Sequence, residues 1–522
     1  MNRIAIITCV LSFFVSQGLN AQEARIKIDT DRKIGQIDKN LYSNFVEHLG
    51  RCVYGGIYDP TSSKAGKDGL RTDVLEAIRN LNVAITRYPG GNFVSNYHWL
   101  DGVGPNRVPR MELAWARLET NEFGTDEFVD FAKKVGTEPY FAVNLGTGTI
   151  EEAQSWVEYC NVKEGPYYAE LRKKYGHTEP YNIKYWGLGN EMDGDWQMGQ
   201  LTAEDYVKKA REAAKLMRST SPGISLVASG SSNYSPGADP NHWNATIISG
   251  LKGYVDYIAL HMYVGNYQNN YYDFLASPLV MDERTQVVRG MILREKPRRP
   301  IYIAWDEYNV WYRARSGNDV VGTRALEERY NLEDALVITG FLNCFVRNAD
   351  IVKMANMAQL VNVIAPIFTE NDDMFIQTIY YPLQLFSNNM KGESLNVFVD
   401  SPSYNTSPRF SLGDNEVNAN IKDVPYLDVT AALDGDQLVI CVLNRNKDTA
   451  ISTEIICQQG AYTGPVEVYE INGPDIKSEN DFGNTNVKTA RKDDLKKPGA
   501  SFKYSFPAHS VTMFKGKILL TN

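Results

Sequence analysis

The chain is poor in cysteine, in basic charge and in long apolar runs, and each of these shortages excludes a class of protein or partner. It has six cysteines in 522 residues, too few and too scattered for a disulfide framework. Acidic residues outnumber basic ones and the net charge is −9, which argues against nucleic acid or another polyanion as a partner. Beyond the N-terminal segment no apolar run is long enough to span a bilayer, so no membrane partner is expected.

The N-terminal segment has the three parts of a secretory signal peptide. Arg3 precedes an apolar run at 4–15, and small and polar residues follow at 16–21. We therefore predict that residues 1–21 are a signal peptide and that the chain is exported to the periplasm or the exterior. A membrane anchor is the alternative, but the run is well short of the roughly 20 residues needed.

Loss of Cys9 with this leader would leave five cysteines, an odd number. Cys441 and Cys457 lie in neighbouring strand-like runs and could pair, although a buried free thiol is the commoner state for such residues.

Motifs of metal and phosphate chemistry are also missing. The six histidines show no HExxH pattern and no Cys/His ligand spacing. There is no Walker loop and no G-x-S-x-G elbow. We therefore predict no metal site and no cofactor.

What the chain does have is a long alternation of short β-rich runs with amphipathic helical patterns, from about residue 41 to about residue 385. Such βα repeats indicate an α/β protein, and eight of them predict a (β/α)8 TIM barrel. The eight runs are 41–47, 84–88, 139–144, 183–188, 225–229, 257–261, 301–305 and 351–355.

The pattern changes after about residue 386, where short alternating strands are separated by Asn, Asp, Gly and Pro. This is typical of an additional all-β sandwich domain. Another alternating run at 25–29 precedes the barrel and could complete the same sandwich. The expected organisation is a signal peptide at 1–21, N-terminal sandwich strand or strands at 22–40, the barrel at 41–385 and the C-terminal sandwich at 386–522.

Two glutamates end predicted strands of the barrel, where the active sites of this fold lie. Glu191 follows the fourth run and Glu307 the seventh. Hydrolysis of a glycosidic bond with retention needs one carboxylic acid to protonate the leaving oxygen and one carboxylate to attack the anomeric carbon. A single Glu at a strand end is more often an ion-pair partner. The two glutamates alone are therefore weak evidence for a glycoside hydrolase.

The set of polar residues at or just past strand ends strengthens the case. These residues are Glu47, Arg87, Asn92, Asn190, Glu191, His261, Tyr263, Glu307 and Gln359. Trp99 and Trp311 are candidate stacking platforms for sugars, although most tryptophans of such proteins pack in the core.

Seven segments of the barrel, in order, resemble glycoside hydrolase family 51, the α-L-arabinofuranosidases. They are 44–51, 87–93, 99–102, 187–191, 261–263, 305–311 and 356–362. The resemblance continues into the sandwich at 424–429, 442–445 and 507–511, and no catalytic position departs from it.

The resemblance implies a role for each candidate. Glu191 would be the acid/base and Glu307 the nucleophile of a retaining, exo-acting α-L-arabinofuranosidase. Arg87 and Tyr263 would support the charged form of Glu307. The expected sugar-binding residues are Glu47, Asn92, Asn190, His261, Tyr263, Gln359, Trp99 and Trp311, with a positioning role for His261.

The expected substrate is an arabinose-containing plant polysaccharide or oligosaccharide. The family resemblance also suggests a homo-oligomer, often a hexamer. Two other functions stay open at this point. One is a related β-xylosidase or endo-β-glucanase, because one carboxylate pair serves many sugars. The other is a non-catalytic carbohydrate-binding protein, whose expected mark is a lost carboxylate.

Overall fold

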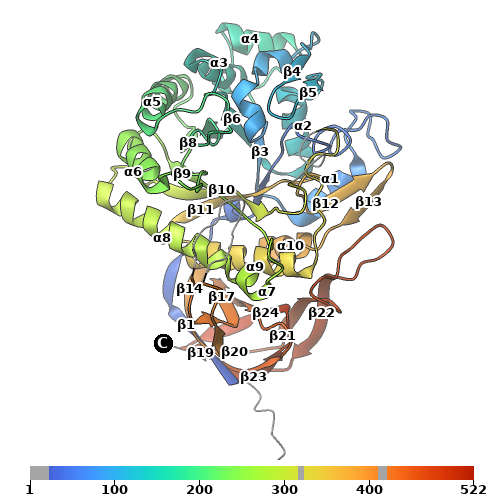
Figure 1. Ribbon diagram of the computed structural model, residues 1–522, viewed down its shortest axis with the longest axis vertical. Helices are drawn as coiled ribbons and strands as arrows, with labels where there is room; N and C mark the ends of the chain where they lie inside the picture. The colour runs from blue at the N-terminus through green and yellow to red at the C-terminus, as the bar shows by residue number, and fades with distance from the viewer. Residues whose placement is uncertain (1–22, 316–321, 409–419, 522) are drawn as a thin grey trace, which may run out of the picture.

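The computed structural model describes residues 23–315, 322–408 and 420–521. They form two stacked parts, a barrel with its helices and a β-sandwich beneath it (Figure 1). The predicted signal peptide, 1–21, lies outside the described residues.

Eight parallel strands close the barrel, in the ring order β10-β11-β2-β3-β6-β7-β8-β9. Side chains such as Ile85, Tyr140 and Met354 fill its interior as a separate core cluster, so the barrel is packed and not a pore. The strands are β2 (Ser43–Phe45), β3 (Ile85–Tyr88), β6 (Glu138–Val143), β7 (Tyr185–Leu188), β8 (Ser225–Ala228), β9 (Tyr257–Val264), β10 (Tyr302–Val310) and β11 (Val352–Ala358).

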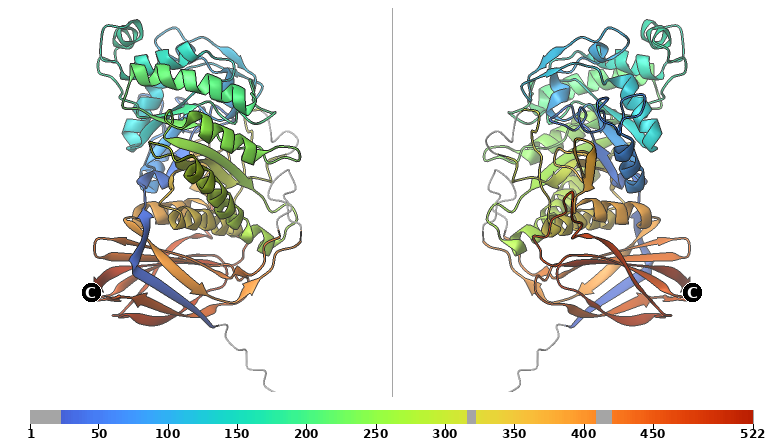
Figure 2. Two further views of the ribbon diagram at one scale, coloured as in Figure 1. Left: turned by 90° about the vertical axis from the view of Figure 1, so that its left-hand side faces the viewer. Right: turned by 90° about the vertical axis from the view of Figure 1, so that its right-hand side faces the viewer.

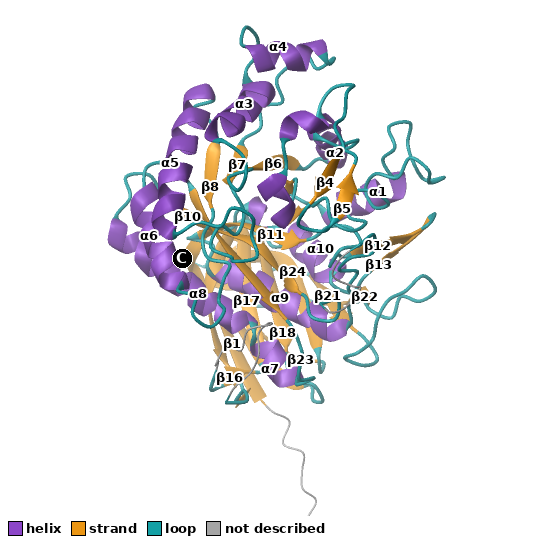
Figure 3. Ribbon diagram, turned by 45° about the horizontal axis from the view of Figure 1, so that its top comes forward, coloured by secondary structure: helices purple, strands orange, loops and turns teal. Residues whose placement is uncertain are grey.

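Helices surround these strands, as Figure 3 shows with the top of the molecule tilted forward. The helices are α1 (Thr72–Leu81), α2 (Thr125–Val135), α3 (Ile150–Asn161), α4 (Tyr167–Lys174), α5 (Ala203–Thr220), α6 (Pro240–Leu251), α7 (Tyr271–Ala276), α8 (Pro278–Glu295), α9 (Leu332–Arg347) and α10 (Tyr380–Asn389), with 3-10 turns η1 (Lys39–Leu41), η2 (Asn92–Asn96) and η3 (Trp99–Gly102). Two hairpins, β4 (Arg110–Glu112) with β5 (Arg117–Glu119) and β12 (Ile367–Glu370) with β13 (Asp373–Ile376), extend from the loops.

The predicted fold class, a TIM barrel with an added β-sandwich, is confirmed. Each of the eight predicted runs overlaps one barrel strand. Thr149 caps α3 by accepting a hydrogen bond from the backbone N–H of Glu152, which satisfies one of the free N–H groups at the helix start.

The sandwich contains ten strands, of which nine follow the order β22-β21-β24-β18-β17-β14-β1-β19-β23, while β20 pairs with β24. The N-terminal strand β1 lies between β14, to which it is antiparallel, and β19, to which it is parallel. The strands are β1 (Glu23–Gln36), β14 (Glu393–Asp400), β17 (Leu427–Asp434), β18 (Gln437–Asn444), β19 (Ile451–Gln458), β20 (Gly460–Tyr462), β21 (Val466–Asn472), β22 (Lys488–Leu495), β23 (Ser501–Phe506) and β24 (Ser510–Leu520), with a small hairpin of β15 (Ser403–Tyr404) and β16 (Val424–Pro425) beside it.

Helices α9 and α10 lie between the barrel and the sandwich (Figure 2). Helix α9 contacts β10 on the barrel side and β14, β17, β18 and β24 on the other. All but one of its residues are buried, as expected for a helix that is covered on every face.

Cys441 and Cys457 do not pair; both are buried free thiols, as are the other three cysteines of the described ranges. Among the helices in those ranges, none combines the length and the apolar character that crossing a membrane requires.

Candidate active site

One cavity of about 460 Å³ opens at the carboxyl ends of the barrel strands, which is where this fold places its active sites. Most of the predicted site residues come together there from different strands. Those that line the cavity are Glu47, Asn92, Glu191, His261, Tyr263, Glu307, Trp311 and Gln359. Arg87 and Asn190 lie directly behind this lining, through their contacts with Glu307 and with each other.

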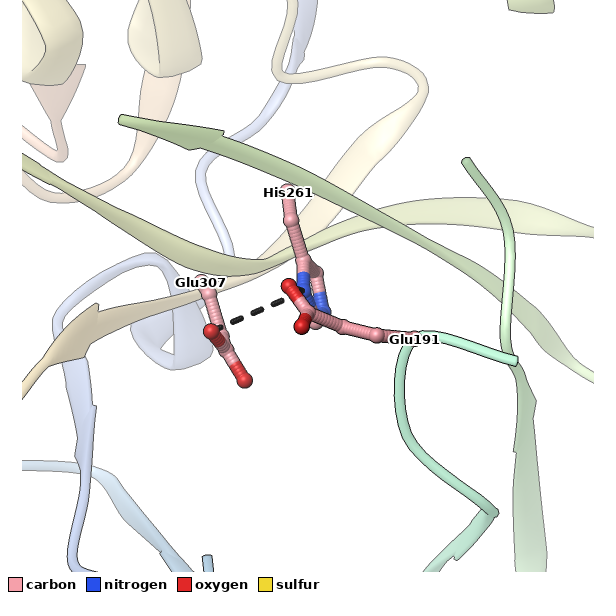
Figure 4. A group of neighbouring side chains, drawn as sticks. All are labelled: Glu191, His261 and Glu307. Atoms are coloured by element: carbon pink, nitrogen blue, oxygen red, sulfur yellow. Dashed lines mark hydrogen bonds and ion pairs between the residues drawn. The ribbon is translucent and has the colours of Figure 1, made fainter. Parts of the chain in front are cut away.

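Glu191, His261 and Glu307 form the centre of the cavity, and Figure 4 shows their side chains close together. Glu191 lies in the loop after β7, His261 on β9 and Glu307 on β10. Nδ1 of His261 lies 3.0 Å from Oε1 of Glu191 and 3.6 Å from Oε2 of Glu307. One carboxylate oxygen from each glutamate lies within 4.8 Å of the other. Two carboxyl groups this close can act on the same small substrate group.

Glu307 is held as a carboxylate by three neighbours. Burial alone would raise its pKa, but His261, Arg87 and Tyr263 outweigh burial, so the pKa lies below the ordinary value. Nη1 of Arg87 donates to Oε1 at 2.9 Å, and the hydroxyl of Tyr263 donates to Oε2 at 2.7 Å. A charged, well-fixed carboxylate suits a nucleophile.

Glu191 is shifted in the opposite direction. Burial and the negative charge of Glu307 raise its pKa, against the weaker opposing effects of His261 and of the indole of Trp196. The indole N–H donates to Oε2 of Glu191 at 2.6 Å. A carboxyl group that keeps its proton towards neutral pH suits a general acid.

The backbone at Glu191 is also unusual, since its φ is 44°. This left-handed conformation costs a residue with a side chain of order 1–3 kcal/mol, and such strain recurs at functional sites. It follows Gly189, which also has a positive φ, so the chain turns sharply as β7 ends and directs Glu191 into the cavity.

A bulge in β10 brings Glu307 inward. Along β9 and β10, Trp305 pairs with Leu260 and Glu307 pairs with the next residue, His261, so Asp306 is extra. Asp306 also points inward, where it accepts hydrogen bonds from Tyr140 and Asn356. Without the bulge, strict alternation would turn Glu307 to the opposite face from Asp306.

Glu47 is the third acid that lines the cavity, and it is buried and fully engaged in hydrogen bonds. Its Oε1 accepts from the backbone N–H of Phe93 at 3.0 Å and the indole of Trp115 at 3.1 Å, and Oε2 accepts from Gln359 at 2.9 Å. Burial, offset by the Phe93 bond and reinforced by the charge of Glu307, raises its pKa to about 7.

The backbone at Gly91 lies against this carboxylate cluster. A side-chain carbon there would lie 3.2 Å from Oε1 of Glu307 and 3.4 Å from Oε2 of Glu47. Only glycine leaves this wall of the cavity open, and it brings Asn92 to the lining. Asn190 accepts a hydrogen bond from Arg87, which fixes its amide beside the same wall.

The structure places the two predicted tryptophans differently. Trp311 lines the cavity, edge-to-face with Tyr263 at 5.4 Å. Trp99 does not: it is 1% exposed, stacks on Trp156 and donates its indole N–H to the carbonyl of Glu152. The expectation that Trp99 binds sugar is therefore corrected, because its ring is enclosed in the aromatic core between η3 and α3.

Other cavity residues carried no signal in the sequence, and four of them are Trp115, Trp196, Tyr234 and Arg284. Trp115 lies between the strands of the β4–β5 hairpin, and Trp196 and Tyr234 lie in the loops after β7 and β8. None of them ends a barrel strand, and the position of a loop side chain depends on tertiary contacts that a sequence pattern does not contain.

Among the described residues, Glu191, His261 and Glu307 are the group whose spacing could hold a metal ion. Arg87 already supplies a positive charge to Glu307 within this group. The expectation that the chemistry needs no metal stays a prediction.

Comparison with known proteins gives matches along almost the whole chain. Residues 77–277 match the model of the α-L-arabinofuranosidase 1 domain, and residues 306–510 match that of the α-L-arabinofuranosidase C-terminal domain. α-L-Arabinofuranosidase C of Emericella nidulans is 38% identical over 96% of this chain and 99% of its own length. An α-L-arabinofuranosidase structure from Thermotoga maritima, solved as an arabinose complex, is 36% identical with a TM-score of 0.86 and covers 95% of this chain and 100% of its own.

A third relative corrects one prediction. The Bacillus subtilis protein named intracellular exo-α-(1→5)-L-arabinofuranosidase 1 is 41% identical over 89% of this chain and 93% of its own length. The prediction that this chain is exported to the periplasm or the exterior is therefore wrong. An apolar run after a single arginine is a short pattern, and it has less weight than a match along most of the chain.

Proposed function

Because this chain belongs to the α-L-arabinofuranosidases of glycoside hydrolase family 51, we propose that it removes terminal α-L-arabinofuranosyl groups from arabinose-containing glycans by a retaining, double-displacement mechanism. The observation that carries the proposal is the approach of two carboxylates with opposite pKa shifts, one oxygen of each within 4.8 Å of the other. Retaining enzymes have carboxyl groups about 5–5.5 Å apart and inverting enzymes about 6.5–9.5 Å.

In the first step, Glu307 attacks the anomeric carbon while Glu191 gives its proton to the departing glycosidic oxygen. The carbon–oxygen bond to the leaving group breaks and an ester bond to Glu307 forms. Arg87 and Tyr263 hold Glu307 through one oxygen each, which fixes the direction of attack.

In the second step, Glu191 is a carboxylate and takes a proton from the water that attacks the same carbon. The ester bond breaks and Glu307 returns to its charged form. Two inversions at one carbon leave the product with the configuration of the substrate. His261, placed between the two glutamates, is proposed to position Glu191 through both steps.

Glu47, Asn92, Asn190 and Gln359 are proposed to bind the hydroxyls of the arabinofuranosyl ring, with Trp311 at its edge. Glu47, Asn92 and Gln359 line the cavity and Asn190 lies directly behind them. Such buried polar groups penalise a ligand that lacks matching hydroxyls. The proposal that action is at chain ends rests on the Bacillus subtilis relative, which is named an exo-acting enzyme. Assembly into a homo-oligomer, up to a hexamer, stays a prediction.

The test combines stereochemistry with nucleophile rescue. Glu307→Ala should abolish turnover of an aryl α-L-arabinofuranoside, and added azide should restore it and give a glycosyl azide of inverted configuration. The wild-type enzyme in methanol and water should give a methyl glycoside of retained configuration, as followed by proton NMR. An inverted methyl glycoside from the wild type, or no rescue by any small anion, would overturn the mechanism.

A panel of aryl glycosides tests the substrate separately. The α-L-arabinofuranoside should have the highest kcat/KM. A β-D-xyloside or β-D-glucoside turned over faster would favour the related glycosidases instead. Full activity of Glu307→Ala would show that Glu307 is not the nucleophile.

A further inference from the structure

The side of the cavity opposite the proposed sugar-binding residues carries an arginine that the mechanism does not use. Arg284, in the second turn of α8, lines the cavity. It makes no hydrogen bond or ion pair to any residue within 23–315, 322–408 or 420–521. Its described contact is with the ring of Tyr234, whose centroid lies 3.4 Å from the guanidinium carbon.

The barrel topology places this arginine on the leaving-group side. Glu47 follows β2 and Tyr234 follows β8, and these two strands are diametrically opposite in the ring of eight. The loop of Tyr234 is fixed to the loop of Glu191, because Asp193 accepts hydrogen bonds from the backbone N–H groups of Ser232 at 2.7 Å and Asn233 at 2.8 Å. Arg284 and Tyr234 are therefore on the side of the general acid, away from Glu47 and Gln359.

The stacking on Tyr234 prepares the guanidinium for a planar anion. A guanidinium that lies on an aromatic face keeps its N–H groups in the plane, free for two parallel hydrogen bonds. A carboxylate accepts such a pair, whereas single hydroxyls do not. A partly buried arginine without a hydrogen-bond partner also carries an uncompensated desolvation cost. Binding of a carboxylate would offset that cost.

We infer that Arg284 and Tyr234 form a subsite for a carboxylate on the leaving group, so that the enzyme favours arabinofuranosyl groups attached to or beside a uronic acid. This inference rests on the proposed function, since it names the aglycone that the same site prefers. The ring of Trp196, 43% exposed at the cavity and bonded to Glu191, would pack against the same leaving-group sugar.

The experiment compares one substrate with and without its charge. An arabinofuranosyl galacturonide and its methyl ester differ only in the carboxylate, and kcat/KM is measured for both. Wild-type enzyme should prefer the acid, and Arg284→Gln should lower the acid-to-ester ratio about tenfold, the value of one charge-assisted contact. Arg284→Lys should lie between the two, because it keeps the charge and loses the planar pair of donors.

Arg294→Gln is the matched control, since it removes an exposed positive charge from the same helix, where Arg294 pairs with Glu295. It should leave the acid-to-ester ratio unchanged. Equal wild-type rates on acid and ester, or an equal loss on both substrates in Arg284→Gln, would overturn the subsite while the proposed function stands. Failure of the wild type on both substrates and on the aryl arabinofuranoside would instead contradict the proposed function.

Discussion

Glu191 and Glu307 show how one residue type acquires two chemical characters within a single cavity. Both are buried, and burial alone would raise the pKa of each. The difference comes from their neighbours, because Glu307 has Arg87 and Tyr263 as donors and Glu191 faces the charge of Glu307. The pKa values of the two glutamates are therefore shifted in opposite directions before a substrate binds, upward for Glu191 and downward for Glu307.

Tyr263→Phe tests the downward shift in the pKa of Glu307. Loss of the hydroxyl that donates to Oε2 of Glu307 at 2.7 Å should raise the pKa of Glu307, so the acid limb of the pH profile of kcat/KM should move to higher pH. At the optimum, kcat/KM should fall roughly 10- to 100-fold, as expected for a hydrogen bond to a charged group. The measurement is the pH dependence of aryl arabinofuranoside hydrolysis.

Tyr308→Phe is the control for this substitution. The Tyr308 hydroxyl is buried on the same strand as Glu307 and has no hydrogen-bond partner among the described residues, so its removal should shift neither limb. If Tyr263→Phe lowered activity with an unchanged acid limb, Tyr263 would contact the sugar without tuning the nucleophile.

Much of the site could be predicted at the level of residues, for a physical reason. In a barrel, strand ends meet in space, so Glu47, Glu191, Glu307 and Gln359 could be grouped without knowledge of their contacts. Trp99 could not be separated from them, because the sequence around a tryptophan does not show whether its ring faces a sugar or the core. Arg284 lies within an ordinary helical pattern, and only its unpaired position beside Tyr234 distinguishes it.

Single elements also contain information that periodicity does not show. The run 301–305 predicts a strand, but the strand continues as β10 to Val310 and contains the bulge at Asp306. Period-two alternation would place Asp306 and Glu307 on opposite faces, and nothing in the residue types shows the extra residue. The packing of helix α9 could not be predicted from periodicity either. Its residues are buried on all sides, so the sequence shows no amphipathic pattern that would indicate which face meets the core.

Helix α9 begins with a capping box that we expect to be important for stability. The side chain of Asn331 accepts from the backbone N–H of Asp334, and the Asp334 side chain accepts from the backbone N–H of Asn331. Because both residues are buried, water cannot replace the lost bond, and Asn331→Ala should lower the free energy of unfolding by about 1–2 kcal/mol. Urea denaturation followed by circular dichroism measures it.

Thr202→Ala at the cap of α5 is the comparison. Thr202 accepts from the backbone N–H of Asp205 at a solvent-exposed helix start, where water can substitute. The loss should be smaller than for Asn331→Ala. An equal or larger loss at Thr202 would show that burial of the α9 cap adds nothing.

At the scale of the whole molecule, the barrel and the sandwich are joined by a buried charge cluster. Asp428 on β17 pairs with Arg347 at the end of α9 and with Arg445, whose Nη2 lies 2.6 Å from Oδ2. Alternating strands predicted a sandwich, but its strand order could not be read from them, because β1 reaches β14 and β19 from more than 350 residues away. Pairings between such distant segments depend on the completed barrel and leave no local pattern.

Asp428→Ala tests this junction. Its removal leaves the buried guanidinium of Arg445 without its ion-pair partner, whereas Arg347 keeps its pair with Asp282. Breaking a buried pair in this way costs about 3–5 kcal/mol. The thermal midpoint measured by calorimetry should therefore fall clearly, whereas Asp436→Ala, which breaks the exposed pair with Lys517 on the same sheet, should change it little.

The pH dependence separates a charge effect at Asp428 from a packing effect. Burial would raise the pKa of Asp428, but Arg347 and Arg445 outweigh it and hold the pKa below the ordinary value of 3.8. The contribution of the charge is thus complete above that ordinary value and is lost as the pH falls through the lower folded-state pKa. The stability difference between wild type and Asp428→Ala should shrink below pH 3.8. A difference that stayed constant into acid would mean that Asp428 joins the two parts by its shape and not by its charge.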